Sequence, residues 1–477
     1  MKIKRIFIGI VFLFTLACNF TSQVPVSTPT SVPPTFTPTA ALPTATPTAA
    51  LPTATPTAAL PTATPLYIPP ECVGQPVATL PAATTVAEPT PGLGTNPYLS
   101  KSEQLKIFEE LTGPIPDLYV YPDFNGLDWP AIVAKYRVKV EGGLDTEAFY
   151  TEMQNLINEL GDNHSNYLSP DNVAASDAEL AGKIDYVGIG VQVLPMLDKG
   201  RLSILMVFPG SSAEHAGLKP HDSLLAVDGI PLVENGIPYA QRVRGPACSA
   251  IVLTVQSPSE AARNVPLIRY AINTSLPIIA RLVTTHDGSR IGYIYIPSFF
   301  DETIPEKVKQ ALEQFGPLDG LILDNRMNSG GSSNVMEPIL GYFTSGTLGH
   351  FNSRSATRPL QVSADPINNS QNMPLVVLVG TDTVSFGEIF SGVLQDVGRA
   401  YIVGQTTLGN VETLHGHNLS DGSRLWLAEE RFVPLHSQAD WEKTGIVPDV
   451  QAYADWDTFT FENDPSVAAA LTLLGHN

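Results

Sequence analysis

The sequence predicts an α/β fold, because strands and helices alternate in the C-terminal half of the chain. Apolar strands are expected at 291–296, 321–323 and 375–379. Amphipathic helices are expected at 306–315, between the first two strands, and at 388–397, after the third. This order of elements is typical of α/β architecture. A β-rich module and a helical segment are expected before this core.

The first 18 residues have the pattern of an export signal. A basic start is followed by an apolar stretch, Ile6 to Leu16, that is short for a membrane span. Leu16 and Ala17 precede Cys18 and resemble the lipobox of bacterial lipoproteins. We therefore expect lipidation at Cys18 and an extracytoplasmic, membrane-anchored protein, with ordinary signal cleavage and secretion as the alternative.

Residues 19–97 are expected to form a disordered spacer. They are rich in Pro, Thr and Ala, and the unit PTATPTAAL begins at Pro43 and again at Pro52. Such a composition cannot bury a core and favours extended polyproline conformations. The segment would hold the folded part of the chain away from a membrane.

The next segment, 98–181, is expected to be helical. Apolar side chains recur at helical spacing from Phe149 to Leu160, and Gly161 can end that helix. His164 follows in a predicted loop. Asp162 and Ser165 could orient its imidazole or could instead satisfy the backbone of the turn.

Charge and cysteine content limit the possible partners and the compartment. The chain has 27 basic and 47 acidic residues and a formal charge of -20, which argues against nucleic acid as a partner. Besides Cys18, the chain has Cys72 and Cys248. These two could pair in an oxidising compartment, but a buried free thiol at Cys248, which lies in an apolar stretch, is at least an equal expectation.

Ser385 occupies the turn between the strand 375–379 and the following helix. The free N–H groups of a first helical turn can stabilise an oxyanion beside such a side chain. Ser385 and Glu388 also fit a capping box, which would only start the helix. A second strand runs into 324–331, where paired glycines let backbone N–H groups approach a ligand.

Together these segments resemble the S41 peptidases, the C-terminal processing and tricorn-type serine proteases, over roughly residues 98–455. In that family, D-x-R-x-N-x-G-G supplies oxyanion contacts and S-x-x-E-I carries the nucleophile. The resemblance implies Ser385 as the nucleophile, with the N–H of Phe386 and that of Gly330 or Gly331 as the oxyanion hole. It also implies protein or peptide substrates and no metal or organic cofactor.

The resemblance further implies a crotonase-like or ClpP-like peptidase core at 273–460, followed by a tail at 461–477. Residues 182–272 resemble an inserted PDZ domain, in which the loop Gly188, Ile189, Gly190 and Val191 would bind peptide tails. The glycines would free backbone N–H groups for a terminal carboxylate, and the next strand could pair with the peptide. An ordinary glycine-containing hairpin is the alternative.

A serine nucleophile needs a proton acceptor. Processing peptidases of this family place a lysine in a G-K-G turn, but the matching position here is Asn410, which cannot act as a base. The tricorn-type branch uses a histidine and a glutamate, which match His164 and Glu442. We expect a triad of these two residues with Ser385, with His436 as a fallback base.

The function expected from these motifs is that of an extracytoplasmic serine endopeptidase. Because Asn410 replaces the usual lysine, a catalytically inactive peptide-binding scaffold is the main alternative. A carrier of hydrophobic ligands is a third possibility. His415 and His417 share one face of a predicted strand, but without a third ligand they predict a surface pair and no metal site.

Overall fold

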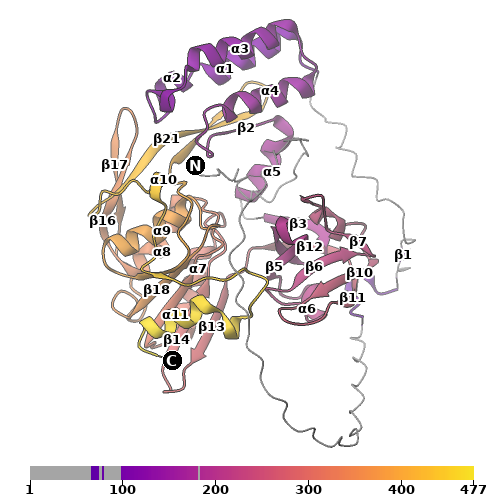
Figure 1. Cartoon of the computed structure of the whole chain (residues 1–477), viewed down its shortest axis with the longest axis vertical. Helices are drawn as coiled ribbons and strands as arrows, with labels where there is room; N and C mark the ends of the chain where they lie inside the picture. The colour runs from indigo at the N-terminus through magenta and orange to yellow at the C-terminus, as the bar shows by residue number, and fades with distance from the viewer. Residues whose placement is uncertain (1–65, 75–77, 80–97, 181–182, 477) are drawn as a thin grey trace, which may run out of the picture. The chain divides into compact units, whose positions relative to one another are not determined.

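The computed structural model describes residues 66–74, 78–79, 98–180 and 183–476 (Figure 1). The proposed export signal, Cys18 and most of the proposed spacer lie outside these ranges. Within the described ranges, no helix combines the length and apolar composition needed to cross a membrane.

Helices occupy the segment that was predicted to be helical. A capping box between Ser100 and Glu103 starts the first helix, and the side chains of Asp128 and Asp145 cap two others. Their apolar faces share one buried cluster with the long strand β21 (Arg424–Pro434). The helices are α1 (Lys101–Thr112), α2 (Ile115–Leu118), α3 (Trp129–Gly142), α4 (Thr146–Asn158) and α5 (Pro170–Leu180).

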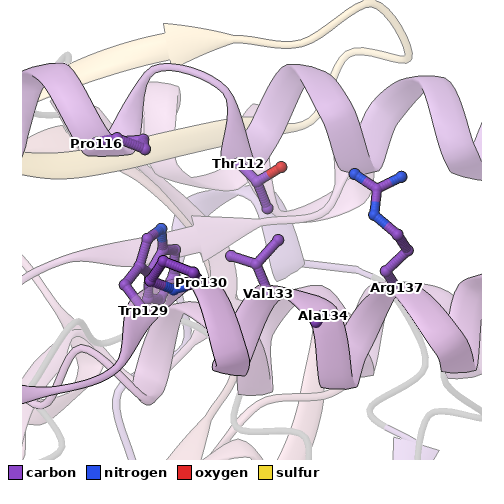
Figure 2. Close-up of a pocket in the computed structure, with 7 residues that line it drawn as sticks. All are labelled: Thr112, Pro116, Trp129, Pro130, Val133, Ala134 and Arg137. Carbon is purple, nitrogen blue, oxygen red and sulfur yellow. The ribbon is translucent and has the colours of Figure 1, made fainter.

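A pocket of about 320 Å³ lies between α1 and α3 (Figure 2). Trp129, Pro130 and Val133 from α3 face Thr112 of α1 across it. The pocket contains none of the residues that the sequence predicts as catalytic or peptide-binding, so the candidate site must be sought elsewhere.

The segment predicted as a β-rich module supplies most strands of a largely antiparallel sheet that β4 borders on one edge. The order β1-β10-β6-β5-β4 is extended by β11 beside β10 and by β7 beside β6, and two further pairs are β12-β3 and β8-β9. The strands are β1 (Ala78–Thr79), β3 (Lys183–Gly188), β4 (Val191–Met196), β5 (Arg201–Val207), β6 (Ser223–Val227), β7 (Ile230–Pro231), β8 (Val233–Glu234), β9 (Ile237–Pro238), β10 (Ser249–Gln256), β11 (Arg263–Ile268) and β12 (Tyr270–Ser275). The short helix α6 (Ser212–His215) follows β5.

A disulfide joins Cys72 to Cys248. Of the two alternatives that the sequence allowed, a disulfide or a free thiol, the structure has the disulfide. Next to it, β1 pairs in parallel with β10. Both Cys72 and β1 fall inside 19–97, and the spacer prediction was therefore too long. Composition indicated disorder there, but a covalent bond and a strand pairing attach the end of this segment to the folded part.

Removing the disulfide is expected to destabilise the protein. Because the two cysteines are 176 positions apart in the sequence, chain entropy predicts that Cys72→Ala with Cys248→Ala lowers the free energy of unfolding by about 5 kcal/mol. Urea unfolding of the oxidised protein and the variant measures this difference. The two proteins should converge under a reducing agent, and equal midpoints under oxidising conditions would contradict the prediction.

The central sheet of the C-terminal part of the chain has the order β13-β14-β15-β18-β19-β22. Strands from β14 to β22 are parallel, and β13 is antiparallel to β14. All side chains of β15 and β18 are buried, as expected for parallel strands covered on both faces. The strands are β13 (Ile279–Thr284), β14 (Arg290–Tyr295), β15 (Gly320–Asp324), β18 (Leu375–Val379), β19 (Tyr401–Gly404) and β22 (Val450–Gln451).

Helices cover both faces of this sheet. One face packs against α7 (Ile304–Phe315), α8 (Ser333–Phe343) and α9 (Phe386–Asp396). The opposite face packs against α11 (Pro465–Leu473) through Val467 and Ala470. Residues 461–477, expected to be a tail, thus supply a helix of the core, because an apolar sheet face would otherwise stay exposed.

A second sheet carries the segments that flank the candidate site. Its order is β17-β16-β21-β2. A further strand, β20, pairs with β21 along the edge opposite to β2. The strands are β2 (Asn166–Leu168), β16 (Gly346–Asn352), β17 (Thr357–Val362), β20 (Thr413–Asn418) and β21 (Arg424–Pro434). Since β2 follows His164 and β20 follows Asn410, β21 holds these two segments on its opposite edges.

Candidate active site

Ser385 lies in the turn between β18 and α9, as predicted, in a strained backbone conformation. Its φ of 56° and ψ of -125° fall in a region that glycine adopts readily and other residues rarely do. The side chain makes no capping hydrogen bond to the helix. The capping interpretation of this serine is therefore wrong, and its hydroxyl group is left for another role.

The glycine loop 324–331 lies directly against this turn. The N–H of Val384 donates to the carbonyl oxygen of Asn328 at 2.9 Å, and Asn325 Nδ2 donates to the carbonyl oxygen of Gly387 at 2.8 Å. A Cβ atom at Gly330 would lie 2.8 Å from Ser385 Cβ. The two predicted edges therefore meet in one place, and only glycine allows so close an approach.

Backbone donors for an oxyanion are present beside Ser385. The N–H of Phe386, the first residue of α9, has no hydrogen-bond partner among the described residues, and neither has that of Gly331. The N–H of Gly330 already donates to Asn328 Oδ1 at 2.9 Å. The sequence did not decide which of the two glycines supplies the second oxyanion donor. Gly331 keeps a free N–H for this role, while Gly330 allows the close approach to Ser385.

A buried ion pair supports the loop. Arg326 donates to Asp324 Oδ1 at 2.9 Å, and its Nη2 also lies 2.7 Å from Asp464 Oδ2, in the residue that caps α11. Tyr293 donates its hydroxyl to Asp324 at 2.6 Å. Burial opposes ionisation of Asp324, but Arg326 outweighs it and holds the pKa of Asp324 below its usual value.

The loop that carries His164 is fixed by its neighbours. Asp162 Oδ1 accepts the N–H groups of His164 at 2.9 Å and Ser165 at 2.8 Å. The hydroxyl of Ser165 donates to Asp162 Oδ2 and accepts the N–H of Ala428 in β21. Asp162 and Ser165 therefore satisfy the backbone of the turn, the second of the two roles considered for them.

The imidazole of His164 faces a carboxylate that the sequence did not indicate. His164 Nδ1 lies 3.8 Å from Glu412 Oε2, and the two side chains are 12% and 1% exposed. Glu412 Oε1 accepts the hydroxyl of Tyr121 at 2.7 Å. Glu412 lies two residues after Asn410, and no motif spacing singled it out, because only the pairing of β20 with β21 brings it there.

Glu442 lies in the short helix α10 (Trp441–Thr444) and reaches this network from the other side. Its Oε2 accepts the N–H of Val411 at 2.8 Å, and its carboxyl group interacts with that of Glu412, which raises the pKa of Glu442. No hydrogen bond or ion pair links Glu442 to His164 in the part of the chain that the structure describes. The expected partnership of these two residues therefore runs through Glu412.

The turn at residues 409–411, after β19, connects the helix that follows Ser385 to the carboxyl groups beside His164. Glu388, one helical turn after Ser385, accepts the N–H groups of Gly409 at 2.9 Å and Asn410 at 2.8 Å. Burial of this carboxyl group raises the pKa of Glu388 to about 7. Since the N–H of the next residue, Val411, donates to Glu442, the turn links helix α9 to the carboxyl pair beside His164.

Comparison with known proteins identifies the family of this chain. Residues 290–452 match the profile of peptidase family S41. The carboxyl-terminal-processing protease of Synechocystis sp. is 30% identical over 393 residues, which cover 80% of this chain and 90% of that protein. The chain belongs to peptidase family S41. It is therefore a serine-type peptidase, a hydrolase of the carboxyl-terminal-processing protease family.

Further relatives agree with this assignment. The carboxyl-terminal-processing protease of Picosynechococcus sp. is 31% identical over 379 residues, covering 76% of the S41 peptidase described here and 86% of the relative. A solved structure entitled photosystem II D1 C-terminal processing protease is 24% identical, covers 79% of this chain and 98% of that chain, and has a TM-score of 0.53. This similarity confirms the predicted fold class.

Two other histidine predictions have clear outcomes in this S41 peptidase. The backbone N–H of His436 donates to Asp396, at the far end of α9 from Ser385. An 11-residue helix is about 16 Å long, so His436 is not the fallback base. His415 Nε2 lies 3.5 Å from Glu430, and His417 Nε2 lies 2.5 Å from Glu429, so each ring of the predicted pair faces a carboxylate.

Proposed function

We propose that this S41 peptidase is an extracytoplasmic endopeptidase that cleaves protein or peptide substrates through an acyl-enzyme at Ser385. The strained turn that presents Ser385 against Gly330, beside the free N–H of Phe386, is the observation that carries this proposal. Strain of this kind persists only where surrounding contacts enforce it, and it is concentrated at functional sites.

In the proposed reaction, His164 takes the proton of Ser385 as Oγ attacks the scissile carbonyl carbon. The N–H groups of Phe386 and Gly331 stabilise the oxyanion. Collapse of the tetrahedral intermediate breaks the C–N bond, and the leaving amine takes the proton from His164. A water molecule, deprotonated by His164, then attacks the acyl carbon. The bond between that carbon and Oγ breaks, His164 returns the proton to Oγ, and the product leaves with a new carboxyl end.

Residues 182–272 serve in this proposal as a PDZ-like module that binds substrate tails. Support comes from β4, which borders its sheet and could pair with an added peptide strand. The loop Gly188–Val191 enters β4, and a Cβ atom at Gly190 would lie 2.2 Å from Ser211 Cβ. Glycine is thus required where the loop packs against the start of α6, beside the proposed carboxylate site.

The proposed location outside the cytoplasm rests on two features. The disulfide between Cys72 and Cys248 is of a kind that persists in oxidising compartments. The lipobox-like residues before Cys18 support a membrane anchor by lipidation. Mass spectrometry of the N-terminal peptide from membrane fractions detects the lipid directly.

A serine-reactive fluorophosphonate tests the nucleophile and the base together. We expect peptide mapping to find the label on Ser385, and His164→Ala to slow labelling by about 10²–10⁴-fold because the hydroxyl loses its proton acceptor. The inactive-scaffold alternative predicts no label on Ser385 even when the protein still binds peptide tails. Equal labelling rates in the native protein and the His164→Ala variant would remove His164 as the base.

A further inference from the structure

We propose that Glu412, and not Glu442, is the carboxylate that positions the imidazole of His164, and that Glu442 carries the proton of the carboxyl pair. This inference rests on the proposed function, because it concerns the base that would activate Ser385. It assigns a role to Glu412 for which the sequence gave no signal.

The first argument is the contact with the ring. His164 Nδ1 is buried and makes no hydrogen bond of ordinary length within the described residues, while Glu412 Oε2 faces it at 3.8 Å. A small rotation of either side chain closes this gap to a hydrogen bond, and such bonds tighten when substrate binds. The N–H at Nδ1 would then point to Glu412, which leaves Nε2 to accept the serine proton.

The second argument is the position of the proton in the pair. Two carboxyl groups in contact cannot both be ionised in a buried site. Glu412 receives the hydroxyl of Tyr121 and faces an imidazole that becomes cationic during the reaction. Glu442 receives only the N–H of Val411 and lies near the carboxyl of Glu388. The negative charge is therefore better stabilised on Glu412.

The directions of the pKa shifts agree with this distribution. Burial and the adjacent Glu412 both raise the pKa of Glu442. Burial also opposes the anion of Glu412, but the adjacent His164, Glu442 and Tyr121 outweigh it and lower the pKa of Glu412. A protonated Glu442 can donate to Glu412 and fix its orientation, as an outer hydrogen bond does for a catalytic carboxylate.

Other ionisable groups around the pair do not reverse this distribution. Asp162 is bound by the N–H groups and the hydroxyl of its own turn. Arg431 of β21 lies over the ring of Tyr121 and pairs with Asp440 at 3.1 Å. Two further groups face the pair from packed elements, Tyr119 of the helical segment and Glu388 of α9.

The test compares Glu412→Gln with Glu442→Gln in the full chain, using an unfolded protein substrate across pH 5–9. In Glu412→Gln we expect kcat to fall by about 10²–10⁴-fold with little change in KM, because an amide nitrogen facing Nδ1 favours the wrong tautomer. The acid limb of the pH profile should also move to lower pH, because the imidazolium loses its neighbouring negative charge.

In Glu442→Gln we expect kcat to fall by less than about tenfold, because the amide is neutral and still donates a hydrogen bond to Glu412. The order of the two losses is the decisive result. A larger loss in Glu442→Gln, or equal losses in both variants, would overturn the proposal. Thermal unfolding of both variants shows whether either loss reflects misfolding.

Tyr121→Phe keeps the proposal testable if Glu412→Gln does not fold. It removes one hydrogen bond to Glu412, and we expect a several-fold loss of kcat with KM retained. Unchanged kcat in this variant would count against the role of Glu412. Failure of the proposed function itself gives a different result, because either the native protein would cleave nothing or cleavage would persist in Ser385→Ala, whatever the two glutamate variants do.

Discussion

Ser385→Ala is expected to lower kcat/KM against an unfolded protein substrate by on the order of 10⁶-fold, because the acyl-enzyme cannot form without the hydroxyl. The fold should be unaffected, since this hydroxyl makes no capping hydrogen bond. Cleavage assays on the native protein and the variant, at matched folded concentrations, measure the effect. Equal cleavage by the two proteins would remove Ser385 as the nucleophile.

Replacing Ser385 with glycine distinguishes the effect of this residue on activity from its effect on the free energy of unfolding. Ser385→Gly should be as inactive as the alanine variant, but it relieves a backbone conformation that strains any residue with a Cβ atom. After allowing for the greater freedom of glycine in the unfolded chain, we expect its free energy of unfolding to rise by about 1 kcal/mol. Urea unfolding should therefore rank glycine above alanine, and the reverse order would show that the turn is unstrained.

Gly330→Ala is expected to reduce kcat by more than about 10³-fold. The added Cβ atom would lie 2.8 Å from Ser385 Cβ and 3.2 Å from the nitrogen of Phe386, so the nucleophile must shift and the oxyanion donor is obstructed. Losing one such donor alone costs about 10²–10³-fold. Steady-state kinetics on the folded variant provide the measurement.

Gly288→Ala is the matched control for this experiment. Gly288 has a φ of 86°, almost the same as the 85° of Gly330, but a Cβ atom there would meet no atom within 4 Å. Both variants carry the backbone strain of roughly 1 kcal/mol, and only Gly330→Ala crowds the nucleophile. Similar kcat values in the two variants would contradict the close packing of the loop on Ser385.

The parts of the site that are local in sequence could be predicted from it. The turn carrying Ser385 and the loop 324–331 each join a short apolar strand to polar or glycine residues, and parallel neighbouring strands bring such ends together. The sequence could not show that the serine side chain leaves its helix uncapped. That outcome depends on the backbone conformation at Ser385, which the contacts of the glycine loop enforce.

Non-local contacts account for what the sequence did not show. Glu412 becomes a neighbour of His164 only because β2 and β20 pair with opposite edges of β21. The sequence could not predict whether Cys72 and Cys248 pair, because that depends on β1 docking beside β10. In each case the deciding contact joins segments far apart in the chain.

The bond between Arg326 and Asp464 makes assembly of the site a late event in synthesis. Ser385 and both loop glycines emerge from the ribosome before the segment that neutralises Arg326 has been made. Until that segment packs against the loop, the guanidinium of Arg326 pairs only with Asp324 among the described residues. The loop 324–331 then lacks one of these two ion pairs. The full support of the glycine loop therefore requires the segment that carries Asp464, which is translated after Ser385.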